Sequence, residues 1–478
     1  MMPSTGDARR RPEAWAADEP PSGIDERRRH PGGRGRIAAS IAGATFLLAG
    51  CQHYAPAPLA TVPPLSPSAD RLAGVAGRGA LTADDVVRLA LANNPDLRAL
   101  RAKRGIANAQ LLQAGLLPNP TLTGDFLPLV SGVGEVSAWS VALGYDLKAL
   151  ITYRSRRRGA RDAAGQAAAD LLWQEWQVAG QARQLTVDLT GVQAQRPIAE
   201  QLYRILFARN AATQQALARG DATLLTTAPT LAALQAARTG RDAVDQRLLQ
   251  LGHQLNALIG LTPDAQLALA PNPELPPPDP TAVRQSLATL PQRRPDLLAL
   301  RLGYAAQEEA VRTAVLSQFP DLILGPQGAS DSSRVINAGP QVAASVPIFD
   351  HAQGAIAIAR ATRAQLRAEY DARLAMTTGE VGAALREIDQ LRRQLNVAQR
   401  DLPAARVAAD RAVAARGASA IDEAAFTALI TTRFTKELEV MTLRLALLDR
   451  QVALQTLLGV GLPQVETLPM TAPAEAAR

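Results

Sequence analysis

The sequence of 478 residues is 47% hydrophobic and only 4% aromatic, a balance that favours long packed helices over a thick globular core. Its formal net charge of +7 is mild for this length, and no nucleic-acid-binding motif occurs, so nucleic acid is not an expected partner. The single cysteine, Cys51, argues against a disulfide framework and a cysteine-based metal site. The histidines are isolated and lack metal-ligand spacing: His30, His53, His253 and His351. Because no catalytic set of side chains occurs either, we expect no enzyme, no metal and no other cofactor.

Residues 1–50 have the pattern of an N-terminal extension followed by a lipoprotein signal peptide. Arg34 and Arg36 precede an apolar run that is too short to span a hydrocarbon core of about 30 Å but suits a signal peptide. The run ends in Leu48-Ala49-Gly50-Cys51, which resembles a bacterial lipobox, so Cys51 is expected to carry the lipid (palmitate) of the mature protein. The alternative is a small buried cysteine after a short core helix. Gln52 is not the aspartate that commonly retains lipoproteins in the inner membrane, so the resemblance implies the outer membrane.

The first structural unit is predicted to begin, after a proline-rich tether, with a long helix and two strands. Thr82 is expected to cap a helix that runs to about Leu117, where prolines end it. Residues 121–127 and 139–146 alternate between apolar and small or polar side chains, which indicates a hairpin of two strands. In the second strand the large side chains are expected on one face: Trp139, Val141, Leu143 and Tyr145. The small or polar residues are expected on the opposite face: Ser140, Ala142, Gly144 and Asp146.

Two interpretations of this hairpin are open from the residues alone. It is either a half-buried hairpin of a soluble domain or a segment of a membrane barrel, with large apolar groups toward lipid and small ones toward a lumen. No helix follows nearby whose bulky face could cover the strands, which favours the membrane segment.

A helical pattern then continues from about Arg154 to Ala218, roughly 96 Å at 1.5 Å per residue. Pro197 is expected to kink this helix. Arg219 and Gly220 are predicted to form a turn, and a return helix with heptad-like apolar spacing follows to Leu261.

The second half of the chain repeats this order, because the sequence NNPDLRALR at residues 93–101 reappears as RRPDLLALR at residues 293–301. The predicted elements are a helix at 281–318, strands near 320–327 and 340–348, a long helix from about 353 to 415 with a break at Pro403, and a return helix at 420–458. We therefore divide the chain into five segments: extension and signal peptide (1–50), lipid-anchored proline-rich tether (51–80), first repeat (81–270), second repeat (271–463) and C-terminal tail (464–478).

These features together resemble the TolC-like outer-membrane efflux family, in its lipoprotein branch. The resemblance covers about residues 80–463 and rests on motifs that occur twice in the same order: the two helix starts, Pro118-Asn119-Pro120 and Phe319-Pro320-Asp321 before the strands, Arg-Gly at the turns, and Leu258-Ile259-Gly260-Leu261 with Leu457-Leu458-Gly459-Val460. The family implies a mainly α fold with a small transmembrane β part. Four strands from each subunit of a trimer would close one β-barrel, continued by an α-helical periplasmic barrel.

The implied function is that of the outer-membrane channel of a tripartite efflux system, a passive exit duct for drugs, metal ions or other small molecules. The implied partners are further copies of the chain in a homotrimer, a periplasmic adaptor (membrane-fusion) protein, an inner-membrane pump and outer-membrane lipid. The alternative is a periplasmic adaptor or coiled-coil scaffolding lipoprotein, which the two strand pairs disfavour.

The resemblance places the candidate functional residues at the two turns between long helices. A periplasmic tip at which adaptor hairpins dock would include Arg219, Gly220, Arg416 and Gly417. In the family, acidic residues shortly after the second turn narrow the closed tunnel, and Asp422 and Glu423 match them best, with Asp221 a weaker candidate. Three copies of each carboxylate near one axis would repel one another and attract cations. The competing interpretation is a solvated helix start, where acids favour the helix dipole.

Two further groups of residues stand out from the pattern. Five arginines follow the second strand directly: Arg154, Arg156, Arg157, Arg158 and Arg161. They indicate either contact with anionic lipid at the periplasmic headgroup level or a solvated helix start. Trp173 and Trp176 are expected to be packing residues rather than a ligand site.

Overall fold

The structure is a computed structural model that describes residues 54–73, 79–271 and 275–459. The expected signal peptide with Cys51 and the expected tail at 464–478 lie outside these residues. Residues 1–63 and 64–478 form separate units, and every described helix and strand belongs to the second unit.

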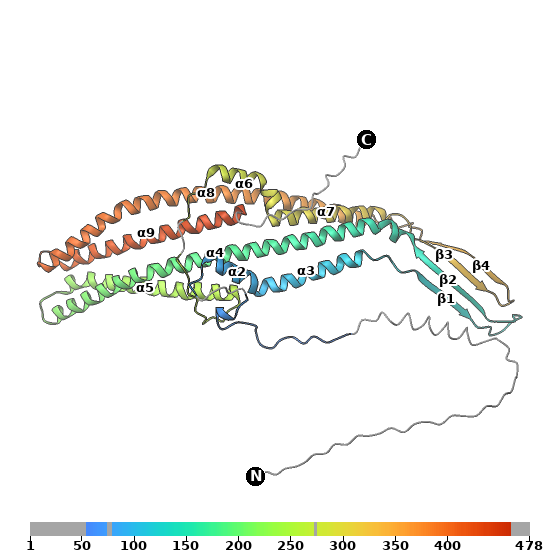
Figure 1. Cartoon of the computed structure of the whole chain (residues 1–478), viewed down its shortest axis with the longest axis horizontal. Helices are drawn as coiled ribbons and strands as arrows, with labels where there is room; N and C mark the ends of the chain where they lie inside the picture. The colour runs from blue at the N-terminus through green and yellow to red at the C-terminus, as the bar shows by residue number, and fades with distance from the viewer. Residues whose placement is uncertain (1–53, 74–78, 272–274, 460–478) are drawn as a thin grey trace, which may run out of the picture. The chain divides into compact units, whose positions relative to one another are not determined.

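The described part of this unit is mainly helical, with four strands (Figure 1). After a short 3-10 helix, η1 (Ala69–Arg71), the first half contains α2 (Ala83–Asn93), α3 (Pro95–Ala114), β1 (Thr121–Leu127), β2 (Ala138–Asp146), α4 (Leu147–Ala218) and α5 (Leu224–Ile259). The second half contains α6 (Pro280–Arg293), α7 (Pro295–Leu316), β3 (Leu322–Ser330), β4 (Ile336–Ala344), α8 (Gln353–Gly417) and α9 (Glu423–Leu458). Among the described residues, no helix is both long and apolar enough to cross a membrane.

The strands form one antiparallel sheet in the order β1-β2-β3-β4. Since β2 pairs with β3, the sheet joins the two halves of the chain. Gly325 allows this pairing, because a Cβ atom there would overlap the carbonyl oxygen of Leu143 on the neighbouring strand. The two outer strands, β1 and β4, each have one free edge within the described sheet.

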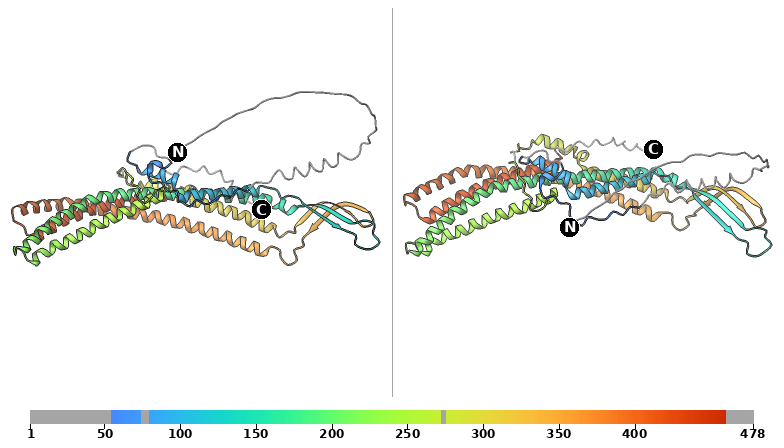
Figure 2. Two further views of the ribbon diagram at one scale, coloured as in Figure 1. Left: turned by 90° about the horizontal axis from the view of Figure 1, so that it is seen from below. Right: turned by 60° about the horizontal axis from the view of Figure 1, so that its bottom comes forward.

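The helices next to the sheet follow the order of its strands. α3 contacts α4, α4 contacts α7 and α7 contacts α8, so these four helices run side by side into the strands (Figure 2). α5 and α9 return along α4 and α8, and α4 also contacts α9. The α4–α5 and α8–α9 turns lie at the end of the helices opposite the strands (Figure 1). We call these two turns, with the adjoining helix ends, the tip; it comprises residues 216–226 and 415–426.

The predicted helices at 82–117 and 281–318 are each divided in two, and the prediction of one unbroken helix was wrong. Thr82 does cap α2, in a capping box with Asp85. The break follows because a proline disfavours helical backbone at the residue before it. Asn94 accordingly has ψ 126°, and Arg294, at the same place in the second half, has ψ 123°. The repeated motif therefore starts the second helix of each pair.

The long helices continue through their prolines. Pro197 lies inside α4 and Pro403 inside α8, so the predicted break at Pro403 was wrong. Each proline removes one helical hydrogen bond, a loss that helices of 72 and 65 residues absorb because neighbouring helices pack along them. α4 also begins at Leu147, directly after β2, rather than near Arg154.

The strands of the second half are displaced from their predicted positions. β3 ends at Ser330 and β4 starts at Ile336, whereas 320–327 and 340–348 were expected. Asp331 sets this turn, since its carboxylate accepts the N–H groups of Ser333 and Val335 at 2.8 and 3.0 Å. Alternation of side chains indicates a strand but does not define where the hairpin turns.

Candidate functional site at the helical tip and the helix junctions

The first tip turn holds Arg219 and Asp221 next to each other. α4 ends at Ala218, and Gly220 adopts φ +82°, a conformation that favours glycine. The N–H of Asp221 donates to the carbonyl oxygen of Ala216 at 2.9 Å and closes the helix end. The guanidinium of Arg219 lies 3.1 Å from the Asp221 carboxylate, with both side chains exposed. Such an exposed pair contributes little to stability.

The second tip turn has the same hydrogen bonds two positions later than the sequence match indicates. The N–H of Ala420 donates to the carbonyl oxygen of Ala415 at 2.8 Å, and Ser419 adopts φ +55°. Gly220 therefore corresponds to Ser419, whereas Gly417 is the last helical residue of α8. The match of Arg219-Gly220 with Arg416-Gly417 is thus wrong in register, because a serine takes the left-handed position in the second turn.

Glu423 is held by two arginines of the same chain. Arg209 of α4 donates from Nε and Nη2 to the two carboxylate oxygens at 2.9 and 2.5 Å, and Nη2 of Arg416 lies 2.9 Å away. The Glu423 side chain is only 12% exposed. Its hydrogen bond to Arg209 raises the pKa of that guanidinium above its usual value. Because its partners lie on α4 and α8, Glu423 at the start of α9 links the two helical hairpins.

Asp422 and Asp221 differ from Glu423 in their exposure. Asp422 is the N-cap of α9, where its carboxylate accepts the Ala425 N–H at 2.6 Å, and it remains exposed like Asp221. The two exposed carboxylates are accessible from outside the chain, whereas the charge of Glu423 is balanced by two arginines of the same chain.

Arg209 was missed by the sequence analysis, although it is the main partner of Glu423. It lies within α4, ten positions before the turn, and nothing in the helical pattern distinguishes it from other surface arginines. Its guanidinium also lies 5.5 Å from the ring centre of Phe426. Phe426 belongs to an apolar cluster that joins both hairpins near the tip: Leu202, Leu206, Leu234, Ala237, Ala409, Ala412, Phe426, Ile430 and Phe434.

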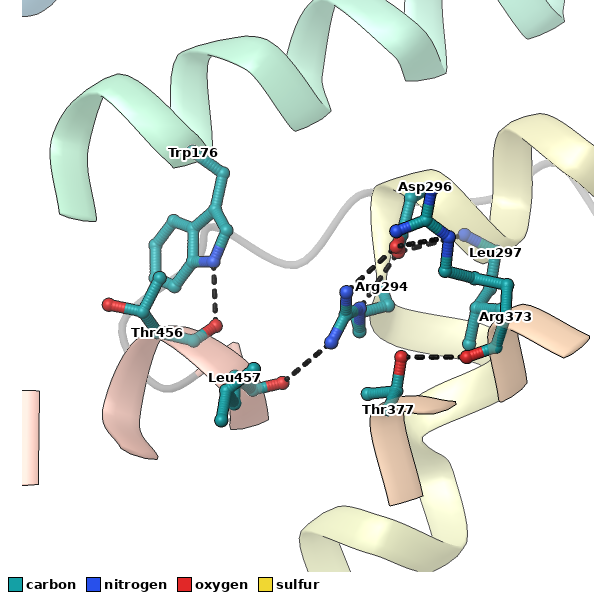
Figure 3. Close-up of polar contacts among 8 residues, drawn as sticks. All are labelled: Trp176, Arg294, Asp296, Leu297, Arg373, Thr377, Thr456 and Leu457. Carbon is teal, nitrogen blue, oxygen red and sulfur yellow. Dashed lines mark hydrogen bonds and ion pairs between the residues drawn. The ribbon is translucent and has the colours of Figure 1, made fainter. Parts of the chain in front are cut away.

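A second polar cluster lies where α6 meets α7 (Figure 3). Arg294 donates from Nε and Nη2 to the two oxygens of Asp296 at 2.8 and 2.7 Å. Both side chains are almost fully buried, with 3% and 6% exposed. Arg373 of α8 lies 3.9 Å from Asp296, and Arg294 also donates to the carbonyl oxygen of Leu457 at 3.4 Å. The pair therefore connects α7 to α8 and to the end of α9.

The first half has a simpler version of this junction. Asn94, at the place of Arg294, donates to the carbonyl oxygen of Leu258 at 2.8 Å, at the end of the return helix α5. Trp176 of α4 donates from Nε1 to the carbonyl oxygen of Thr456 at 2.8 Å (Figure 3), and the ring of Trp173 lies 4.6 Å from the Arg294 guanidinium. The prediction that both tryptophans are packing residues is confirmed. The junctions thus anchor the returning helices, the second through a buried ion pair.

No protein-family model matches this sequence, and no curated protein matches it. Solved structures do match: CusC, described for its transmembrane channel formation, has a TM-score of 0.65 and 20% identity, over 84% of this chain and 99% of that chain. The outer-membrane channel OprN has a TM-score of 0.66 and 20% identity, over 79% of this chain and 90% of that chain. The outer membrane protein VceC from Vibrio cholerae has a TM-score of 0.64 and 17% identity, over 79% of this chain and 96% of that chain. The fold is that of the TolC-like outer-membrane channels.

Within this TolC-like fold, the described residues contain no group of three or more His, Cys, Asp or Glu side chains that could hold a metal ion. They do contain a carboxyl with a strongly raised pKa, Asp449 of α9, which lies next to Asp188 of α4. Burial and a hydrogen bond with Asp188 raise the pKa of Asp449 from 3.8 to about 8. Asp449 therefore keeps its proton at neutral pH, beside the carboxylate of Asp188.

This pair predicts that stability decreases as the pH rises from about 4 to about 8. In that window the folded state binds more protons than the unfolded chain, because folding raises the pKa of Asp449. The stabilisation is therefore complete below the pKa of Asp449 in the unfolded chain and is lost above its pKa in the folded state. Asp449→Asn should remove most of this pH dependence. The stability of the variant relative to the wild type should therefore increase from pH 5 to pH 9. Thermal unfolding across this range measures the effect, with the exposed Asp371→Asn as control. An equal slope in both variants would show that Asp449 does not hold a proton in the folded protein.

Proposed function

We propose that three copies of the chain form an outer-membrane efflux channel, a passive exit duct whose β-barrel lies in the membrane and whose helices extend into the periplasm. The observation that carries this proposal is one continuous apolar face across the four strands. The likeness to channel structures supports it, and the expected lipid on Cys51 would add an anchor to the same membrane.

The strand register aligns the large apolar side chains on one face. Leu122 lies opposite Leu143 and Phe126 opposite Trp139. Directly opposed residues point to the same face, so the set continues through β3 and β4. Its large members are Leu122, Phe126, Trp139, Val141, Leu143, Tyr145, Leu322, Leu324, Ile336 and Val342. Apart from Leu127 and Ile323, the other face carries small and polar side chains, among them Thr121, Thr123, Asp125, Ser140, Gln327, Asn337 and Gln341.

The apolar face is exposed, as Leu122 and Phe126 show with 73% and 70% of their surface accessible. A patch of this kind on one side of a sheet requires an apolar partner, and lipid fits it. The free edges of β1 and β4 require further strands, because a sheet in lipid must close on itself. Pairing of β4 with β1 of the next copy would supply these strands, and the closed barrel would turn its apolar face to lipid. A soluble adaptor or scaffold would leave the face and the edges unsatisfied.

This assignment of faces predicts opposite effects for arginine at two adjacent positions. Val141→Arg places a charge on the lipid side, at a cost of about 2–4 kcal/mol near the bilayer centre. Ser140→Arg faces the other way, beside Asp125, whose carboxylate lies 3.0 Å from the Ser140 hydroxyl, and should be tolerated. The yield of folded oligomer in the outer membrane, seen as heat-modifiable migration on electrophoresis, distinguishes them. Tolerance of Val141→Arg together with loss of the Ser140→Arg oligomer would reverse the assignment.

The tip is the proposed site of docking and gating. Arg219, Gly220, Arg416 and Gly417 lie at the end of the helices opposite the strands, where a periplasmic adaptor would bind. Asp422 and Asp221 supply exposed carboxylates for a cation-attracting ring, and Glu423 with Arg209 holds the hairpins together. Purified protein in detergent should migrate as a heat-modifiable trimer; a soluble monomer would contradict the proposed function.

A further inference from the structure

A groove of about 840 Å³ lies between the strand-proximal parts of α3 and α4. Its two walls differ in character. The α3 wall and the loop after it are apolar, with Leu111, Leu112, Gly115 and Leu116. The α4 wall is polar and basic, with Tyr153, Arg154, Arg157, Arg158 and Arg161.

The apolar wall is exposed and uncharged. Leu112 and Leu116 have 69% and 57% of their surface accessible, and residues 105–114 of α3 carry no charge. The hydroxyl of Tyr153 donates to the carbonyl oxygen of Gly115 at 3.0 Å and fixes the end of α3 against α4. Covering these leucines with an alkyl chain would remove apolar surface from water, which is favourable.

The basic wall has an unbalanced positive charge. The first fifteen residues of α4, 147–161, carry six Lys or Arg and no Asp or Glu. Asp162 follows directly and offsets part of the charge of Arg161 and Arg158. No carboxylate of the described residues lies within ion-pair distance of Arg154 or Arg157. Arg158 lies 3.7 Å from Glu309, but that carboxylate is closer to Arg312, at 2.8 Å. Arg154 and Arg157 therefore have no counter-charge among the described residues, and an anion from outside the subunit would supply one.

We propose that this groove binds an anionic glycerophospholipid, with the phosphate between Arg154, Arg157 and Arg161 and an acyl chain along Leu112 and Leu116. The inference rests on the proposed function, which places the strands in the outer membrane. Arg154 follows the last residue of β2, Asp146, by eight positions, or about 12 Å along a helix. A flexible arginine side chain at that depth reaches the headgroups of the leaflet that faces the periplasm.

A second copy of the chain fits the groove less well, because its charge has the wrong sign. If β4 of one copy pairs with β1 of the next, then α8 of the first copy lies on the α3 side of the second. The first fifteen residues of α8, 353–367, carry Arg360, Arg363 and Arg367 and no carboxylate, and of these three Arg363 is paired within the subunit, with Glu308 at 3.2 Å. Arginines facing arginines would repel one another, whereas a phosphate between them is attracted by both.

The test is lipid binding by the full chain in nanodiscs of phosphatidylcholine with or without phosphatidylglycerol, with bound lipid counted by native mass spectrometry. The triple variant Arg154→Gln, Arg157→Gln, Arg161→Gln should lose retained phosphatidylglycerol by about tenfold or more and keep its oligomer and conductance. The matched control, Arg386→Gln, Arg393→Gln, Arg411→Gln, removes three exposed arginines of α8 far from the strands and should bind as the wild type does.

Three results would overturn this inference. A conducting wild-type channel that retains phosphatidylglycerol no better than phosphatidylcholine excludes the lipid site and leaves the proposed function intact. Equal loss in the triple variant and the control shows that net charge alone acts. Loss of the oligomer in the triple variant with unchanged lipid binding assigns the groove to a second copy.

Discussion

Replacing Glu423 by glutamine is expected to raise the open probability of the channel by about tenfold or more. In the proposed gating, the tip opens when the two helical hairpins separate. Glu423 joins Arg209 of one hairpin to Arg416 of the other. Without the carboxylate, two arginines of the same subunit face each other across this contact. Breaking a buried ion pair costs about 3–5 kcal/mol. Because Arg416 is partly exposed, we expect a smaller cost here, about 2 kcal/mol. A free-energy change of about 2 kcal/mol shifts the equilibrium between closed and open states by more than about tenfold.

Single-channel recording in planar bilayers measures this effect. The matched control is Glu200→Gln, which removes a carboxylate paired with Arg204 at 2.9 Å within α4 alone and should leave the open probability unchanged. Asp422→Asn keeps the helix cap and removes an exposed charge, so it should lower cation preference without opening the channel. If Glu423→Gln opens no more often than Glu200→Gln, the Arg209–Glu423 contact does not hold the tip closed.

Replacing Arg294 by alanine is expected to be the most destabilising single substitution at the helix junctions, at about 3–5 kcal/mol. It leaves the Asp296 carboxylate, 6% exposed, with Arg373 at 3.9 Å as its remaining ion-pair partner and the Leu297 N–H at 2.9 Å as a hydrogen-bond donor. It also removes the contact of the guanidinium with Trp173. The tie from α7 to the end of α9 at Leu457 is lost as well. The double variant Arg294→Met, Asp296→Leu should lose less than the single variant, because no charge then stays buried without a partner.

The first half of the chain supplies the control for this prediction. Asp96 holds the position of Asp296 but is exposed, and its neighbour is Asn94 rather than an arginine. Asp296→Ala should therefore lower the temperature at which the detergent-solubilised oligomer unfolds by several degrees, whereas Asp96→Ala should shift it little. Equal shifts would mean that the buried ion pair does not distinguish the two halves.

Much of the fold could be predicted from the sequence, because its signals are local and repeated. The strand alternation at 121–127 and 139–146, the Thr82 cap and the length of the helical hairpins follow from side-chain spacing and capping chemistry. Errors arose where tertiary contacts decide. Pro403 does not end α8 because packing holds the helix on both sides, and the β3–β4 turn depends on the hydrogen bonds of Asp331.

The candidate site was less accessible to sequence reasoning. Its carboxylates could be located from the turns, but the partner of Glu423, Arg209, comes from another helix 214 positions away. Only the packing of α4 against α9 brings them together. The same holds for Asp188 and Asp449, which carry no shared motif and meet only through that helix contact.

Conductance across a planar lipid bilayer determines whether this chain forms a channel. Purified full-length oligomer added to one side should produce discrete, long-lived current steps that favour cations, and heat-dissociated monomer from the same preparation should produce none. Absence of steps from a correctly assembled, heat-modifiable oligomer, with the Glu423→Gln variant equally silent, would contradict the channel.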